Sequence, residues 1–167
     1  MAENTEQALG DAKKNGDLYE TSHDNIRELL GIEGLPQWIN QSLEELIAGK
    51  SWEELNNRFY KNLAFGTGGM RGRTIGVVVT KAERGRSKEG QTPEYAAVGS
   101  NTLNEITVLR ATKALYLYVR EWMAGEGIKE QPRLVVAHDV RHFSRKFCEL
   151  VANAWSRLGG YSMIFDG

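Results

Sequence analysis

The chain has 167 residues, a length typical of a single domain. Its composition, with 41% hydrophobic and 26% charged residues, is that of an ordinary globular protein. The formal net charge of −1 favours neither a nucleic-acid-binding protein nor a protein of the membrane surface. The single cysteine, Cys148, excludes an internal disulfide, and no stretch has the apolar character of a membrane span or a signal peptide. We therefore expect a cytoplasmic protein that binds neither nucleic acid nor membrane.

The first third of the chain predicts a set of short helices. Residues 1–20 are polar and contain few apolar side chains, so we expect a flexible, poorly packed N-terminus. Helices are expected at about 24–31, after Pro36, and from Ser51, where Ser-Trp-Glu-Glu has the sequence of a capping box. We assign residues 21–63 to a helical leader.

From residue 64 the pattern changes to that of an α/β domain. Residues 65–72 are too rich in glycine for a helix, and residues 73–80 contain the β-branched run of a strand. Residues 81–100 form a long charged connection, of the kind that is often functional or mobile. A long helix is expected at about 103–123. Its predicted apolar stripe consists of Val108, Ala111, Leu115, Val119 and Trp122.

The last part of the chain predicts a βαβ unit. A strand at 133–137, a helix with Ser144 as its N-cap, and a strand at 161–165 are joined by short links. Two strands joined through a helix should be parallel, with a right-handed crossover. Cys148 lies on the apolar side of this helix, where packing in the core is the expected role.

The segment 65–72, Phe-Gly-Thr-Gly-Gly-Met-Arg-Gly, has the chemistry of a small anion site. Its glycines allow the backbone to approach a ligand, Thr67 adds a hydroxyl, and Arg71 adds a cation suited to phosphate. The segment lacks the Gly-Lys-Ser/Thr of a P-loop. A Rossmann fingerprint that began at Gly66 would also need glycine in place of Arg71. The alternative interpretation is a plain glycine turn with a surface arginine.

The segment 138–142, His-Asp-Val-Arg-His, has the spacing of a zinc-protease helix with Asp in place of Glu. Such a site needs both histidines on one face of a helix, but this segment continues a strand, so we expect no metal site. We expect Asp139 to pair with Arg141 or to support a neighbouring loop. The alternative is a simple turn that caps the following helix.

Three segments, in order along the chain, resemble the α-D-phosphohexomutases, the phosphoglucomutase/phosphomannomutase family. The first is 65–72, which is similar to the family's opening signature Phe-Gly-Thr-Ala/Ser-Gly-Leu-Arg-Gly, although Gly68 and Met70 depart from it. Residues 99–112 resemble the Asn-rich turn that starts the family's long helix. Residues 135–144 resemble its Asp-x-Arg-x-x-Ser pattern. The resemblance implies that the chain from residue 64 is an incomplete first domain of this family, an α/β/α domain with a mixed sheet.

The resemblance also implies a chemistry. Family members interconvert hexose 1-phosphate and hexose 6-phosphate, of glucose or mannose, through a phosphoserine and a hexose bisphosphate, with Mg²⁺ held by an aspartate loop. The arginine of the first motif lies beside the phosphoserine, which implies that place for Arg71. Thr67 and Gly68 are then its phosphate-binding neighbours. Arg141, together with Asp139, is implied as a supporting residue.

The family's phosphoserine, metal-binding and sugar-binding loops do not occur in this sequence. We therefore expect an inactive N-terminal fragment of a larger mutase, with no Mg²⁺ bound to the fragment itself. The alternative is a stand-alone, non-catalytic module that binds phosphate or mediates assembly through an exposed strand at 161–166. A nucleotide-binding α/β protein is disfavoured by the missing fingerprints. The sequence carries no signal for an oligomeric state.

Overall fold

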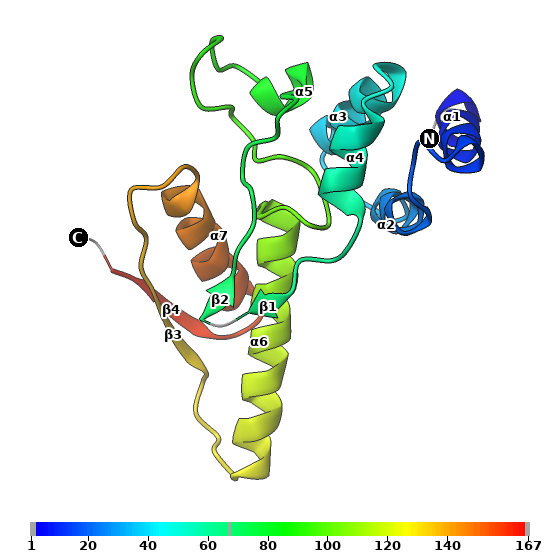
Figure 1. Cartoon of the computed structure of the whole chain (residues 1–167). Helices are drawn as coiled ribbons and strands as arrows, with labels where there is room; N and C mark the ends of the chain where they lie inside the picture. The colour runs from blue at the N-terminus through cyan, green and yellow to red at the C-terminus, as the bar shows by residue number, and fades with distance from the viewer. Residues whose placement is uncertain (1–2, 67, 166–167) are drawn as a thin grey trace. The chain divides into compact units, whose positions relative to one another are not determined.

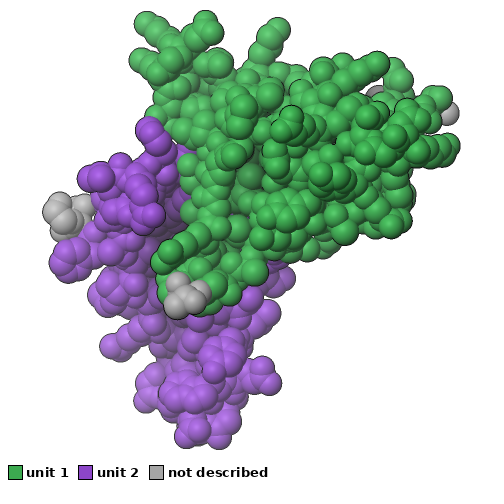
Figure 2. Space-filling model, in the orientation of Figure 1, with its two compact units in different colours: residues 1–104 green, residues 105–167 purple. Residues whose placement is uncertain are grey.

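The computed structural model describes residues 3–66 and 68–165, which fall into two compact units (Figures 1 and 2). Unit 1 spans residues 1–104 and unit 2 spans residues 105–167. The division lies directly before the long helix of the chain, whereas we expected the pattern to change at residue 64. The chain is an α/β protein, as predicted from the sequence.

Helices dominate the described part of unit 1. Their bounds are α1 (Glu3–Asn15), α2 (Glu20–Leu30), α3 (Gln37–Ala48), α4 (Trp52–Phe59) and α5 (Lys81–Arg84). The first four bury apolar stripes against one another, which removes these side chains from water and stabilises the leader. The fully or almost fully buried members of this core are Leu9, Leu18, Ile26, Ile39, Leu43, Leu46, Leu55 and Phe59.

The expectation of a poorly packed N-terminus is wrong for the described residues. Helix α1 contacts both α2 and α3. Leu9 is fully buried, Ala12 is 3% exposed, and Leu18, which follows the helix, is 2% exposed. A narrow stripe of apolar residues is therefore enough to dock a polar helix. The ion pair between Glu6 and Arg27, 3.0 Å, joins α1 to α2 at the surface.

Residues 73–80, predicted as a strand, do not form one. Side chains from α4 occupy backbone groups that a neighbouring strand would need. Arg58 donates from Nη2 to the carbonyl of Val78 over 2.6 Å, and Glu54 accepts from the N–H of Val77 over 3.0 Å. The β-branched residues of this segment have a high strand propensity, but buried charged side chains outcompete the ladder.

The connection that follows contains the short helix α5. Its capping box is complete, because Thr80 Oγ accepts from the N–H of Glu83 over 3.0 Å and the Glu83 carboxylate accepts from the N–H of Thr80. The capping box predicted at Ser51 is not formed, since Ser51 makes no side-chain cap bond to α4. Glu54, the expected partner of Ser51, turns instead toward Arg58.

Unit 2 contains the predicted βαβ unit. Helix α6 (Glu105–Gly125) is followed by β3 (Arg133–Val136), α7 (Ser144–Arg157) and β4 (Tyr161–Ile164). The two strands are parallel, which confirms the prediction, and their register runs from Arg133 opposite Tyr161 to Val136 opposite Ile164. Helix α7 packs on both strands and on α6 (Figure 1).

A buried tryptophan lies at the centre of unit 2. Trp155 of α7 is 1% exposed, and its ring meets the ring of Tyr116 edge-on at 5.1 Å. Its indole N–H donates to the carbonyl of Pro132 over 3.2 Å. Glycine is required at 160, because a Cβ there would overlap the indole. The prediction that Cys148 is buried in this core is confirmed.

The buried face of α6 differs from the predicted stripe. Leu115 and Trp122 are 47% and 54% exposed, although both were predicted to face the core. The residues of α6 that are buried are Thr107, Val108, Thr112, Tyr116 and Met123. Two adjacent faces of this helix are apolar, and periodicity alone does not distinguish the face that packs. Thr112 is tolerated inside because its hydroxyl donates to the carbonyl of Val108 over 2.8 Å.

The described strands form two separate two-stranded sheets instead of one mixed sheet. The strands β1 (Phe65–Gly66) and β2 (Gly69–Met70) are antiparallel, and β3 and β4 are parallel. Among the described residues, no helix combines the length and the apolar character that a membrane crossing requires.

Candidate functional site

The glycine-rich segment 65–72 forms a small hairpin at the surface of unit 1. Phe65 lies opposite Met70 and Gly66 lies opposite Gly69, so Gly68 belongs to the turn that connects the two strands. Gly68 and Gly69 have φ angles of +79° and +133°, which side-chain-bearing residues rarely adopt. No atom would lie within 4 Å of a Cβ at either position, so the space around the turn is open.

Two of the three predicted phosphate-binding residues lie on the described part of this hairpin. Arg71 follows β2 directly, is exposed, and makes no hydrogen bond or ion pair with another described residue. Its guanidinium is always charged and carries donors in a planar fork, so it is available to an anion. Gly68 supplies the open turn. Thr67 lies outside the described residues, so its role stays a prediction.

Both ends of the hairpin are tied to one later segment of unit 1. On the entering side, the N–H of Leu63 donates to the carbonyl of Ser100 over 2.7 Å. On the leaving side, the N–H of Leu103 donates to the carbonyl of Arg73 over 3.0 Å. Residues 97–103 therefore fix the stems of the hairpin, while the space around Gly68 and Gly69 is open.

The second predicted group, Asp139 and Arg141, lies in unit 2 at the end of β3. The Arg141 side chain donates from Nε to Asp139 Oδ2 over 2.7 Å, and its backbone N–H donates to Oδ1 over 3.0 Å. These bonds lower the pKa of Asp139 to about 2. Of the alternatives left open by the sequence, the structure shows the pair. The Asp139 carboxylate is thus bound to Arg141 within the same loop, and the supporting role of the two residues stays a prediction.

The start of α7 corrects the prediction that Ser144 is its N-cap. Ser144 is the first helical residue, and Phe143, with φ +66°, is at the cap position and makes no side-chain cap bond. The Ser144 hydroxyl instead accepts from the N–H of Asp139 over 3.0 Å. His138 and His142 both precede the helix, so they do not form the i, i+4 pair of a zinc-protease helix.

A family model of known proteins matches residues 84–165, and its description is phosphoglucomutase/phosphomannomutase, alpha/beta/alpha domain I. Over this range the chain belongs to the phosphoglucomutase/phosphomannomutase family. No curated protein and no solved structure gives a significant match to the chain.

The matched range begins at the end of α5 and covers the whole βαβ part of this phosphoglucomutase/phosphomannomutase domain. It includes Asp139 and Arg141 but not the hairpin that carries Arg71. The place of Arg71 beside a phosphoserine therefore remains a prediction. The hairpin belongs to unit 1 and the Asp139 loop to unit 2, so each is a separate feature of the structure.

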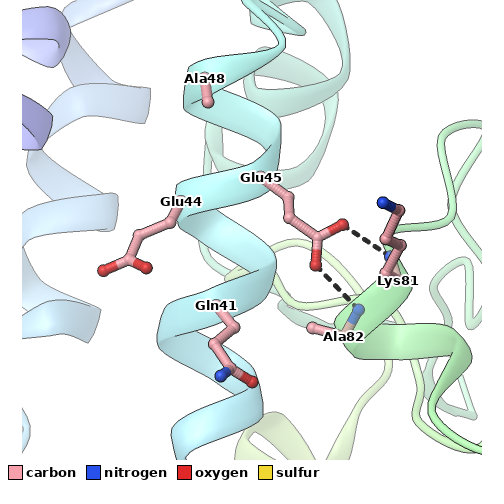
Figure 3. A pocket seen from close by; sticks show the side chains of 6 residues that line it. All are labelled: Gln41, Glu44, Glu45, Ala48, Lys81 and Ala82. Atoms are coloured by element: carbon pink, nitrogen blue, oxygen red, sulfur yellow. Dashed lines mark hydrogen bonds between the residues drawn. The ribbon is translucent and has the colours of Figure 1, made fainter.

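An open groove of about 560 Å³ lies between α3 and α5 in unit 1 (Figure 3). The Glu45 carboxylate accepts from the N–H groups of Lys81 and Ala82, over 2.7 and 2.9 Å, and so caps the start of α5. Glu44 points away from α5 (Figure 3). The Glu45 carboxylate is therefore occupied by the backbone of α5 and is not available to a ligand in this groove.

A buried ion cluster of Glu54, Arg58 and Glu83 was missed by the sequence analysis. Arg58 is 1% exposed, and the two carboxylate residues are 5% and 1% exposed. Arg58 Nε donates to Glu54 Oε1 over 2.8 Å, and its Nη1 donates to Glu83 Oε1. The i, i+4 spacing of Glu54 and Arg58 is visible in the sequence, but such pairs are usually at the surface.

Proposed function

We propose that this chain supplies the first domain of a cytoplasmic phosphohexomutase, which interconverts hexose 1-phosphate and hexose 6-phosphate, with glucose or mannose as the sugar. The observation that carries the proposal is the family match to domain I over residues 84–165. The exposed Arg71 on an open glycine hairpin supports it, because both features suit a phosphoryl group.

In the proposed reaction, an enzyme phosphoserine transfers its phosphoryl group to the free hydroxyl of a hexose phosphate. A hexose bisphosphate forms, and after it reorients the other phosphoryl group returns to the serine. Phosphoryl transfer depends mainly on positioning and on stabilisation of the charge that spreads over the phosphoryl oxygens. In this proposal Arg71 pairs with those oxygens, and Thr67 and Gly68 contribute a hydroxyl and backbone N–H groups.

Mg²⁺ is assigned to the parent protein in this proposal, where it would neutralise phosphoryl charge when bound. In the part of the chain that the structure describes, no three His, Cys, Asp or Glu side chains are grouped so that they could hold a metal ion. The described residues therefore do not fit an Mg²⁺ site, and we route no step of the reaction through one.

We further propose that the chain by itself has no mutase turnover, because the nucleophilic serine loop of the family does not occur in it. A second candidate is a non-catalytic module that binds phosphate or mediates assembly. It is favoured by the apolar residues exposed on the β3–β4 pair, where Val135 is 59% exposed and Met163 is 42% exposed.

An NMR titration with inorganic phosphate at constant ionic strength tests the phosphate role. Backbone amide shifts should concentrate at residues 66–72 and disappear in Arg71→Ala. The matched control is Arg120→Ala, which removes an exposed cation from α6 and should bind phosphate as the unaltered chain does. Shifts that are absent at 66–72, or equal in the two variants, would contradict the proposal.

A coupled assay with glucose 1-phosphate and mannose 1-phosphate tests the catalytic part. We expect no turnover by this chain with either substrate. Turnover above a boiled control would refute the expectation that the chain is inactive alone. Light scattering then addresses the second candidate, since concentration-dependent association without turnover would favour the assembly module.

A further inference from the structure

We propose that the buried ion cluster of Glu54, Arg58 and Glu83 positions the glycine hairpin 65–72, with Arg58 as the central positioning residue. This inference rests on the proposed phosphate role of the hairpin. It goes further by assigning a task to three buried charged side chains that the reaction itself does not use.

Arg58 holds together segments of unit 1 that are distant in sequence. Its guanidinium joins Glu54 on its own helix to Glu83 on α5. It also donates to the carbonyl of Val78 over 2.6 Å and to the carbonyl of Val98 over 3.3 Å. A guanidinium with several fixed partners has little freedom, so it sets the spacing between α4, α5 and the two loop segments.

The cluster reaches the leaving stem of the hairpin through Glu54. Its Oε1 accepts from the N–H of Val77 over 3.0 Å, and its Oε2 lies 3.8 Å from Nη1 of Arg73. Arg73 is two residues beyond Arg71 and carries the carbonyl that binds Leu103. One carboxylate therefore connects the buried guanidinium to the backbone that leaves the hairpin.

The cluster reaches the entering stem through the backbone of Arg58. The carbonyl of Arg58 accepts from the N–H of Asn101 over 2.8 Å. The preceding residue, Ser100, binds Leu63 through its carbonyl and Lys61 through its hydroxyl, the latter over 2.7 Å. Displacement of Arg58 would therefore move residues 100–101, which hold the start of the hairpin.

At two positions the place of Arg58 leaves room only for glycine. A Cβ at Gly76 would overlap the guanidinium, and a Cβ at Gly99 would lie 2.7 Å from the Arg58 carbonyl oxygen. The backbones of both connecting segments therefore pass directly against this residue. Contacts so close transmit a displacement of the side chain to the segments that flank the hairpin.

The charges in the cluster also favour a positioning role over simple stabilisation. Two carboxylates and one guanidinium are buried together, and a buried ion cluster is often no more stabilising than apolar residues of the same volume. What such a cluster provides is a defined geometry, because only one arrangement satisfies all of its hydrogen bonds. Gly68 and Gly69 of the hairpin have open space around them, so we infer that the geometry of the hairpin is set by the stems that the cluster holds.

The test compares Arg58→Lys and Gly76→Ala with the unaltered chain. Lysine keeps the charge but cannot bridge both carboxylates and the Val78 carbonyl, and alanine at 76 displaces Arg58 without removing it. The matched control is Arg27→Lys, a change in the surface pair with Glu6. Two readouts are used: the heteronuclear NOE of the amides at 66 and 68–72, and the dissociation constant for inorganic phosphate from the NMR titration.

In both test variants we expect the hairpin NOE values to fall and the phosphate dissociation constant to rise about tenfold, which corresponds to the ordering of roughly one residue's backbone. Resonances of α1, α2 and unit 2 should stay in place, and Arg27→Lys should change neither readout. Hairpin dynamics and phosphate affinity that match the unaltered chain would overturn the inference. Loss of all unit 1 structure in both variants would overturn it as well, since the cluster would then serve the core in general.

If only Arg58→Lys fails to fold, Gly76→Ala decides. If the unaltered chain binds no phosphate, the proposed function fails but the NOE readout still decides the positioning role. Rigid hairpin amides that become mobile in the variants would uphold it, and amides that are equally mobile in all chains would refute it.

Discussion

Replacement of Glu83 by alanine should lower the stability of unit 1 by an amount that the structure allows one to work out. Glu83 is 1% exposed. Its Oε1 accepts from Arg58, from the Ser42 hydroxyl over 2.9 Å and from the N–H of Val98 over 3.0 Å. Its other carboxylate oxygen accepts from the N–H of Thr80 over 3.3 Å. Alanine leaves all of these donors without this acceptor in a closed part of the protein.

The magnitude follows from two opposing effects. Removal of one partner from a buried ion pair costs about 3–5 kcal/mol, and each orphaned neutral donor costs about 1–3 kcal/mol, although the two costs overlap. On the other side, Glu54 remains to neutralise Arg58, and the excess negative charge of the cluster disappears. We therefore expect a loss near the lower end, about 3 kcal/mol, which is a large part of the roughly 5–15 kcal/mol typical of a domain.

Urea unfolding followed by circular dichroism measures this loss. With a slope of about 1–3 kcal/mol per molar urea, a 3 kcal/mol change lowers the midpoint by roughly 1.5 M. The matched control is Glu6→Ala, which removes a carboxylate from a surface ion pair and should cost about 0.2–1 kcal/mol. If the two variants unfolded at the same urea concentration, the argument that the Glu83 carboxylate is an integral part of a buried network would be refuted.

Three further predictions concern unit 2. Gly160→Ala should destabilise unit 2 by about 1–3 kcal/mol, because the added Cβ overlaps the buried indole of Trp155. The control Gly125→Ala places its Cβ in open space and should be nearly neutral. Equal melting curves for the two variants would contradict the packing of Gly160 against the indole. The pKa of Asp139, about 2, should rise toward its ordinary value of 3.8 in Arg141→Ala, as measured by carboxyl-carbon NMR. Because folding lowers this pKa, the pair contributes to stability above pH 3.8, and this contribution is lost as the pH falls toward 2. Burial raises the pKa of the Cys148 thiol, so iodoacetamide at about pH 8 should alkylate it slowly in the folded chain and quickly in urea. Rapid alkylation without urea would show that the thiol is accessible.

Long periodic segments were the ones that the sequence predicted well. The helix from Ser144 to Arg157 and the strands on either side have clear patterns and clear ends, and the structure contains them as a parallel pair joined by a helix. Local pattern is sufficient there because the period of the apolar residues and the glycines and proline between the segments are short-range features of the sequence. The prediction of a poorly packed N-terminus was wrong, because two or three well-spaced apolar residues can dock a helix when partner helices are present.

Side-chain partners from distant segments explain the other errors. The segment 73–80 has the composition of a strand, but Glu54 and Arg58 occupy its backbone groups. Ser51 and Ser144 have the residue type of helix caps. The expected partner of Ser51, Glu54, binds Arg58 instead, and the hydroxyl of Ser144 accepts from the N–H of Asp139. Competition of this kind depends on which groups the fold brings together, and no local window contains that information.

The sequence alone determined the α/β class, the βαβ unit and the glycine segment with its arginine, because these depend on residue type and short-range spacing. It also carried the resemblance to the phosphohexomutases that the family match then supported over residues 84–165. Only the tertiary structure decided which face of α6 is buried, that residues 73–80 form no strand, and that Arg58 lies buried between two carboxylates. These features arise from contacts between residues far apart in the chain, where burial makes a hydrogen bond or an ion pair outweigh local propensity.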